Sequence, residues 1–282
     1  MDYILAIKMG IQFIEENIDR DITLHDVAKN SYYSPYHYSK IFLKYTGITL
    51  GNYIKIRKID FASSQLLYSR KSLIDISASI GYRSYEAFSR EIKERFGRSP
   101  FYFRKSNKFS YLMNHSYFDE ALLNHVMNHL KFIPEETTLS SFEVIGMLVT
   151  TSLKNNQLDL QWANFNAEID PFLPDTYESF AICESSNALL ADNGDSIFNQ
   201  FLCYKKKSSY KEMPMRFKNK IVEGGNYAIF KHTSTYHSLD LTYRYIWNIW
   251  IHSYQGNYDA TRKSFEHYIK DTSFIHIYIP IK

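Results

Sequence analysis

The stretch GYRSYEAFSREIKERFGRSP, from Gly81 to Pro100, decides the fold of the first part of this chain because an earlier stretch repeats it. The recurring residues, at an offset of 49 and then of 50, are Leu24, Asp26, Val27, Tyr33, Ser39, Lys40 and Gly47, matched by Leu73, Asp75, Ile76, Tyr82, Ser89, Arg90 and Gly97. Each copy is too short to bury a core alone, so both are expected to share one domain. Each copy predicts a short helix, a tight turn and a longer helix, which is a helix-turn-helix pattern.

The charge of the chain is divided unevenly between its two parts. Residues 1–110 contain 18 Lys and Arg against 11 Asp and Glu, a net charge of +7, whereas residues 111–282 contain 15 against 19, a net charge of −4. A basic first part suits a polyanionic partner, and the acidic remainder does not. The two cysteines, Cys183 and Cys203, predict neither a disulfide framework nor a thiolate zinc site. We expect no metal and no cofactor.

The amino-terminal pattern predicts an amphipathic helix rather than a signal peptide. The chain has no apolar run of the length that spans a bilayer. A cytoplasmic protein without a membrane partner is the expectation.

Residues 1–107 resemble the DNA-binding domain of the AraC/XylS family of bacterial transcription regulators. The first unit carries the resemblance in ITLHDVAKN and SPYHYSKIFLKYTGITLGNYI, and the second in SLIDISASIGYRSYEAFSREIKERFGRSPFYFR. The closing pairs Phe96-Gly97, Ser99-Pro100 and Phe103-Arg104 are characteristic of the family. The resemblance implies an all-α domain with two helix-turn-helix units joined by a linker helix. It also implies double-stranded DNA and RNA polymerase as partners.

Outward residues of the two longer helices are the candidates for DNA contact. The family's base-reading positions, carried over by match, fall on Tyr36, Ser39 and Lys40 and on Tyr85, Glu86, Ser89 and Arg90. The later cation Lys44 is expected to meet phosphate. A guanidinium can bind guanine with two hydrogen bonds, which makes Arg90 the strongest candidate. A solvated helix face is the alternative for any one of these residues, but the repeated hydroxyl-then-cation pattern favours DNA contact.

A helical run from Gly51 to Tyr68 connects the two units. Its 18 residues, at about 1.5 Å each, would form a rod of roughly 27 Å. Such a spacer could place two recognition helices about one DNA turn apart, roughly 34 Å. We therefore expect one monomer to read two successive major grooves over an asymmetric site. The first unit departs from the pattern in one place, since Tyr32 stands where the second unit has the turn residue Gly81.

The remaining chain predicts a connecting segment, residues 108–140, that contains a possible helix, and then an α+β domain, residues 141–282. Expected strands are Phe142–Val149, Phe180–Cys183, Phe198–Tyr204, Met215–Val222, Tyr227–Lys231 and Phe274–Ile279, and expected helices are Leu158–Ile169 and Leu239–Tyr254. The string Leu158-Asp159-Leu160 recurs as Leu239-Asp240-Leu241. This repeat indicates a duplicated strand–helix–strand unit, which would form one antiparallel sheet with two helices on it.

The carboxyl-terminal part resembles the GyrI-like effector-binding domain. IVEGGNYAIFKHTSTYHSLDLTYRYIWNIW and SFEHYIKDTSFIHIYIPIK carry this resemblance. Members fused to DNA-binding domains often bind bulky hydrophobic, commonly cationic compounds. The resemblance implies the same here and places Glu266 at the position used for cation recognition. A carboxylate among aromatic rings favours a cation through Coulomb attraction and the ring quadrupoles.

The other candidate pocket residues are Tyr227, Trp250, Tyr268, Trp162 and Trp247. Three alternatives stay open at this point. Glu266 could bond a backbone or tyrosine group in the core, and the tryptophans could serve only core packing. The domain could be a small-molecule hydrolase in which Glu266 is a general base. It could also be a pure protein-interaction module. The leading expectation is a transcription regulator, not an enzyme, controlled by a small hydrophobic effector.

Overall fold

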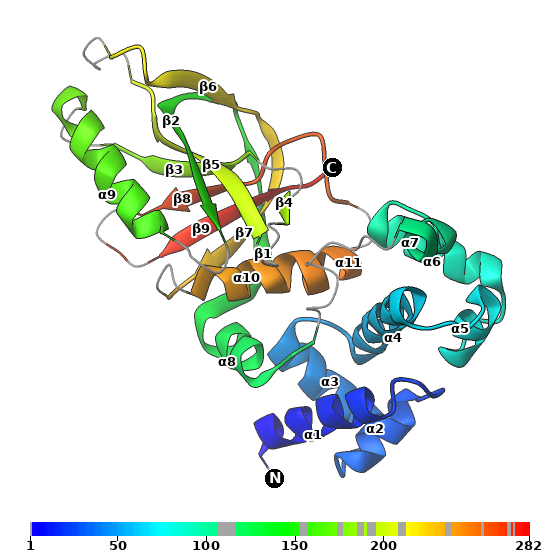
Figure 1. Cartoon of the computed structure of the whole chain (residues 1–282). Coiled ribbons are helices and arrows are strands. Elements are labelled where there is room, and N and C mark those ends of the chain that lie inside the picture. Colours follow the sequence, from blue (N-terminus) through cyan, green and yellow to red (C-terminus); the bar gives the residue numbers. More distant parts are fainter. Residues whose placement is uncertain are drawn as a thin grey trace. The chain divides into compact units, whose positions relative to one another are not determined.

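The computed structural model describes residues 2–106, 117–152, 157–173, 177–184, 189–190, 196–207, 213–234, 238–254, 257–269, 272 and 274–282. The chain forms two compact units (Figure 1). The first comprises Met1–Met127 and Tyr243–Gln255, and the second comprises Asn128–Thr242 and Gly256–Lys282. A segment late in the sequence thus belongs to the same unit as the helix-turn-helix repeat.

The first unit is helical, as the sequence predicts. Its helices are α1 (Tyr3–Glu16), α2 (Leu24–Asn30), α3 (Pro35–Thr46), α4 (Leu50–Tyr68), α5 (Leu73–Ser79), α6 (Tyr85–Phe96), α7 (Pro100–Ser106) and α8 (Glu120–His129). The late segment comprises α10 (Leu239–Tyr245), a π-helical turn η4 (Ile246–Trp250) and α11 (Ile251–Ser253), and its residues from Tyr243 onward belong to the first unit. The predicted linker helix is α4, which has 19 residues and is therefore about 28 Å long.

Local signals set the ends of both recognition helices, α3 and α6. Ser34 and Ser84 are the N-caps, and their hydroxyls accept hydrogen bonds from His37 and Ala87 backbone N–H groups. At the other ends, Gly47 and Gly97 both have φ 73°, the left-handed conformation that closes a helix. The repeated sequence therefore produces the same helix boundaries twice.

The turn before each recognition helix has the same shape in both helix-turn-helix repeats. Gly81 has φ 87°, and Tyr32, at the equivalent position, has φ 59°. The amide of Tyr33 donates to Ala28 O at 3.0 Å, and the amide of Tyr82 donates to Ser77 O at 3.0 Å. Tyr32 therefore adopts the left-handed backbone conformation that Gly81 adopts in the second repeat. This conformation strains Tyr32, since the left-handed region disfavours a residue with a Cβ.

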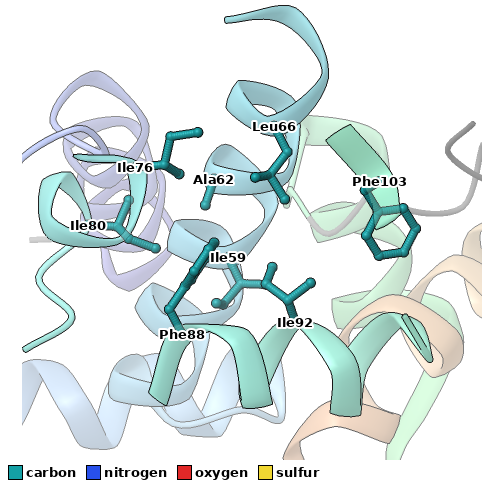
Figure 2. Packing of buried hydrophobic residues seen from close by; sticks show 8 residues of the cluster. All are labelled: Ile59, Ala62, Leu66, Ile76, Ile80, Phe88, Ile92 and Phe103. Carbon is teal, nitrogen blue, oxygen red and sulfur yellow. The ribbon is translucent and has the colours of Figure 1, made fainter. Parts of the chain in front are cut away.

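The second helix-turn-helix unit has its own apolar core against α4 (Figure 2). Its buried members are Ile59, Ala62, Leu66, Ile76, Ile80, Phe88, Ile92 and Phe103. Phe88 and Ile92 come from α6 at helical spacing, so the face opposite them is directed to solvent. Burial of this stripe fixes which residues of α6 are available to a partner.

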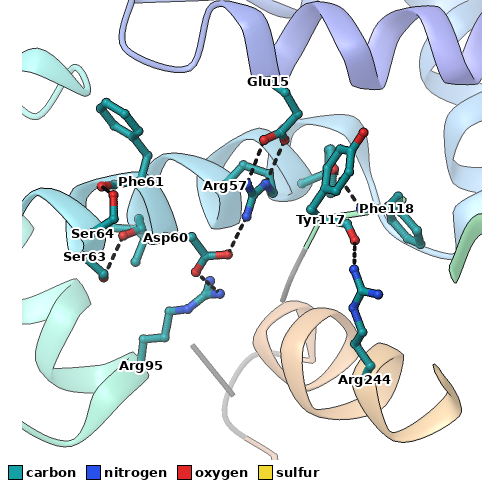
Figure 3. A network of polar contacts seen from close by, with 12 residues as sticks. Glu15, Arg57, Asp60, Phe61, Ser63, Ser64, Arg95, Tyr117, Phe118 and Arg244 are labelled. Carbon is teal, nitrogen blue, oxygen red and sulfur yellow. Dashed lines mark hydrogen bonds and ion pairs between the residues drawn. The ribbon is translucent and has the colours of Figure 1, made fainter. Parts of the chain in front are cut away.

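A buried ion-pair network joins α1, α4 and α6 (Figure 3). Arg57 of α4 binds Glu15 of α1 through two nitrogens, at 2.8 and 2.7 Å. Arg57 also contacts Asp60 at 2.9 Å, and Asp60 contacts Arg95 of α6 at 2.6 Å. The side chains of Asp60 and Arg95 are 3% and 6% exposed. This network links the first helix, the linker and the second recognition helix.

Arg244 connects the segment Tyr243–Gln255 to the rest of the first unit (Figure 3). The guanidinium of Arg244 donates to the carboxylate of Asp119 at 2.6 Å and to the carbonyl oxygen of Tyr117 at 2.5 Å. The neighbouring Phe118 lies against both Tyr53 and Tyr245, with ring centroids 5.3 and 6.4 Å away.

The second unit is built on one antiparallel sheet (Figure 1). Its described strands are β1 (Leu130–Leu139), β2 (Phe142–Ser152), β3 (Ser179–Cys183), β4 (Leu189–Leu190), β5 (Ser196–Lys205), β6 (Lys218–Val222), β7 (Gly225–His232), β8 (Phe265–Tyr268) and β9 (Ile275–Pro280). Helix α9 (Leu158–Ile169), followed by the short 3-10 turn η2 (Asp170–Phe172), lies on one face of the sheet. All six predicted strands and both predicted helices are present.

The strand order is β1-β7-β9-β8-β3-β5-β2-β6, with β4 paired to β5. This order is what a duplication produces: β2, α9, β3 and β5 occupy places equivalent to β7, α10, β8 and β9. Two strands differ from the sequence-based expectation: β1 lies in the predicted connecting segment, and β8 follows the last predicted helix. Strand β8 is four residues long and carries Glu266, so its pattern lacks the apolar alternation of a strand.

Candidate functional site

The first recognition helix presents the predicted residues on its outer face. Tyr36, Lys40 and Lys44 are exposed, and Ser39 is half-buried. The Lys40 ammonium lies 4.4 Å from the centroid of the Tyr36 ring, a cation–π contact that holds both side chains together at the start of α3. This face therefore offers a cation and a hydroxyl to a polyanion.

The buried side of the same helix is locked against α1. The hydroxyl of Tyr38 donates to Ala6 O at 3.2 Å, and burial raises the pKa of Tyr38 to about 12. Gly10 makes this approach possible, since a Cβ there would lie 1.8 Å from the Tyr38 hydroxyl oxygen. Contact with α1 thus fixes the rotation of α3 and the direction of its outer face.

The second recognition helix repeats the arrangement with one difference. Glu86 and Arg90 are exposed and Ser89 is half-buried. Tyr85 is half-buried and packs at the margin of the apolar core near Phe88, with ring centroids 6.4 Å apart. Arg90 is thus the exposed cation of α6 that matches Lys40 of α3.

The sheet register places Glu266 at the centre of the second unit. Glu266 of β8 pairs with Ala181 of β3, which pairs with Leu202 of β5. Because paired residues of antiparallel strands share a face and neighbours along a strand alternate, Gln200 lies on that face too. The Gln200 amide nitrogen donates to Glu266 Oε1 at 3.2 Å, reaching over the small side chain of Ala181. Glu266 is 1% exposed.

Aromatic side chains accompany this buried carboxylate. The Tyr268 hydroxyl donates to Glu266 Oε2. Trp162 of α9 meets the Tyr268 ring edge-on, with centroids 4.9 Å apart. The structure thus brings together three of the six predicted effector residues, Glu266, Tyr268 and Trp162. It adds Gln200 and Ala181, which only the strand register identifies.

Tyr227 lies on the opposite face of the sheet from Glu266. It packs against Phe265, whose side chain alternates with that of Glu266 along β8, with ring centroids 5.3 Å apart. Its hydroxyl donates to Glu223 O at 2.7 Å, and the Arg262 guanidinium lies 4.8 Å from its ring centroid. These contacts place Tyr227 in the core of that face.

Trp247 and Trp250 belong to the segment Tyr243–Gln255, which forms part of the first unit. Both lie in the π-helical turn η4. Trp250 is 5% exposed and stacks on Tyr254, with ring centroids 4.6 Å apart. The resemblance to the GyrI-like domain made these tryptophans pocket candidates, and the structure groups both with the helical unit.

Within the described residues, no group of three or more His, Cys, Asp and Glu side chains is arranged to hold a metal ion. The described helices also include none that combines the length and the apolarity needed to cross a membrane.

Comparison with known proteins matches each part of the chain to a family. Residues 27–106 match a helix-turn-helix domain, and residues 134–282 match the GyrI-like small molecule binding domain. The transposon Tn10 TetD protein of Escherichia coli is 32% identical over 101 residues, which are 36% of this chain and 73% of that protein.

Two further relatives are similar over comparable lengths of the chain. The regulatory protein SoxS of Salmonella typhimurium is 34% identical over 100 residues, 36% of this chain and 94% of SoxS. The transcriptional regulator Rob of Salmonella typhimurium is 27% identical over 110 residues, 39% of this chain and 38% of Rob. The chain is an AraC-family DNA-binding transcription regulator and belongs to the GyrI-like small molecule binding domain family.

Proposed function

We propose that this regulator binds an asymmetric DNA site through α3 and α6 and is controlled by a hydrophobic cation bound at Glu266. The DNA part is supported by the outward placement of Lys40 and Arg90 on two helices with the same caps and the same preceding turn. Each cation follows a half-buried serine, so each face can donate to a base edge or a phosphate.

The observation that carries the effector proposal is the burial of Glu266 between polar and aromatic groups. A carboxylate that is 1% exposed interacts strongly with a charged ligand because little water screens it. Tyr268 and Trp162 provide ring surface beside it, which favours a cation with apolar substituents. The effector would thus be bound by charge and by apolar contact together.

The hydrolase alternative requires Glu266 to take a proton from water. Its two oxygens already accept hydrogen bonds from Gln200 and Tyr268, and it is excluded from solvent. These contacts stabilise a carboxylate as a fixed charge rather than as a base that reaches water. Two of the relatives reported above, SoxS and Rob, are regulators by name, which agrees with a sensor that keeps its ligand.

Selection of bound DNA from random sequence, repeated with a panel of lipophilic cations, tests both parts. We expect one asymmetric site of about 20 base pairs, spanning two successive major grooves. A cation that acts as effector should change the amount of DNA retained, and Glu266→Gln should shift that change to higher cation concentration. A selected site with a single short contact region would overturn the two-helix part. No response to any cation would overturn the effector part.

A further inference from the structure

Two buried polar atoms have no hydrogen-bond partner among the described residues, and each belongs to a side chain that contacts Glu266 or its partner Tyr268. They are Gln200 Oε1 and Trp162 Nε1. Gln200 is 3% exposed and Trp162 is 8% exposed, so solvent does not hydrate either side chain freely. A buried polar group without a partner costs free energy, which a ligand can recover if its own groups are complementary.

Chemistry fixes the orientation of the Gln200 amide. Its nitrogen donates to Glu266 Oε1 at 3.2 Å. The reverse orientation would place the amide oxygen against a carboxylate oxygen, which is repulsive, so Oε1 is the atom left over. Gln200 therefore presents an acceptor next to an anion.

The indole nitrogen of Trp162 has the opposite character. An indole N–H can only donate. The indole ring forms a T-shaped contact with the ring of Tyr268, whose hydroxyl donates to Glu266, so only the Tyr268 side chain links the indole to the carboxylate. The described site thus combines one negative charge, one unsatisfied acceptor and one unsatisfied donor within a layer of aromatic rings.

We propose that the effector is a lipophilic amine bound as its ammonium ion and carrying an oxygen acceptor, rather than a quaternary cation. This inference rests on the proposed cation effector and narrows its chemical class. An ammonium N–H donates to Gln200 Oε1 while its charge faces Glu266, and an ether, hydroxyl or carbonyl oxygen accepts from Trp162 Nε1. A quaternary cation supplies the same charge but leaves Gln200 Oε1 unsatisfied.

The first test compares two cations of equal charge, a diphenylpropyl primary ammonium and its N-trimethyl derivative, in which methyl groups replace the N–H groups. Isothermal titration against the full chain should show the primary ammonium binding about tenfold or more tightly, which corresponds to about 1.4 kcal/mol. Gln200→Met keeps the length of the side chain and removes the acceptor, so the preference should fall to about twofold or less. Equal affinities of the unsubstituted protein for the two cations would overturn the proposal without the variant.

The second test concerns the acceptor and uses Trp162→Phe, which keeps an aromatic ring but removes the N–H. A hydroxylated diphenylpropyl ammonium should bind more tightly than the parent ammonium to the unsubstituted protein, and equally tightly to Trp162→Phe. If the hydroxyl increased the affinity equally for the unsubstituted protein and for Trp162→Phe, the role of Trp162 would be overturned. If neither the ammonium nor the trimethyl cation bound at all, the proposed cation effector itself would fail, and this inference with it.

Discussion

Arg95 and Asp60 form a buried ion pair, 2.6 Å long, that joins the second recognition helix to the linker helix. A second pair, Lys55 with Glu91, joins the same two helices at 2.7 Å but is more exposed, with side chains 55% and 26% accessible. The two pairs connect the same elements in different environments. They therefore allow a matched comparison of what holds α6 in place.

Asp60→Ala should lower the free energy of unfolding of the first unit by about 3–5 kcal/mol, because two buried guanidinium groups lose their shared carboxylate. Burial lowers the pKa of Arg95 and the charge of Asp60 opposes this effect, so removing Asp60 leaves the buried cation less stable. Lys55→Ala, the control, should cost about 1 kcal/mol or less. Denaturant unfolding of both variants measures the difference, and equal losses would contradict it.

Lys40→Ala and Arg90→Ala should each weaken specific DNA binding by about 1–3 kcal/mol and relax the preference at one base pair, in separate grooves. Lys44→Ala should weaken all sequences alike and reduce the salt dependence of binding by about one unit of slope. Binding of the selected site and of scrambled DNA, measured over a range of salt, distinguishes the two effects. Unchanged affinity in both Lys40→Ala and Arg90→Ala would show that other residues read the bases.

Tyr32→Gly should stabilise the first unit by about 1 kcal/mol, since Tyr32 has φ 59° and glycine adopts that conformation without a steric penalty. Tyr32 is 75% exposed, so little packing is lost. Gly81→Ala is the reciprocal change and should destabilise by about 1 kcal/mol or more. Its new Cβ would also lie 3.2 Å from Asp21 Oδ1. Thermal unfolding of both variants should therefore move in opposite directions, and a shift of both in one direction would refute the strain.

The sheet unit should lose stability in acid partly through Asp259. Hydrogen bonds from Thr261 and then Arg262 lower the pKa of Asp259 from 3.8 to about 2. The folded state thus binds this proton less readily than the unfolded state, so the contribution is complete above about pH 4 and is lost as the pH falls through about 2. Asp259→Asn should remove this part of the pH dependence. The prediction would be contradicted if the free energy of unfolding fell by the same amount in both proteins between about pH 4 and pH 2.

Glu266→Gln keeps the shape of the site but removes its charge. It should weaken a lipophilic cation by about 1–2 kcal/mol more than a neutral analogue of the same size, because the carboxylate is desolvated. Isothermal titration of both ligands against both proteins measures this discrimination. Equal losses for the cation and the neutral analogue would assign Glu266 a structural role.

The sequence determined the helix-turn-helix unit almost completely, because its signals are local. Capping by Ser34, the left-handed Gly47 and Gly97, and the apolar spacing of Phe88 and Ile92 each act within a few residues of the chain. The same holds for α9 and the six predicted strands. The repeated Leu-Asp-Leu string was enough to predict the duplication that the strand order displays.

Tertiary structure alone decided which residues surround Glu266. Strand register sets which side chains share a face, and register depends on pairing between segments far apart in the sequence, such as β5 and β8 on either side of β3. That pairing brought Gln200 to Glu266 and turned Tyr227 to the other face. Contacts rather than sequence order likewise assigned Trp247 and Trp250 to the helical unit. Local pattern therefore specified the elements, while long-range packing selected the site.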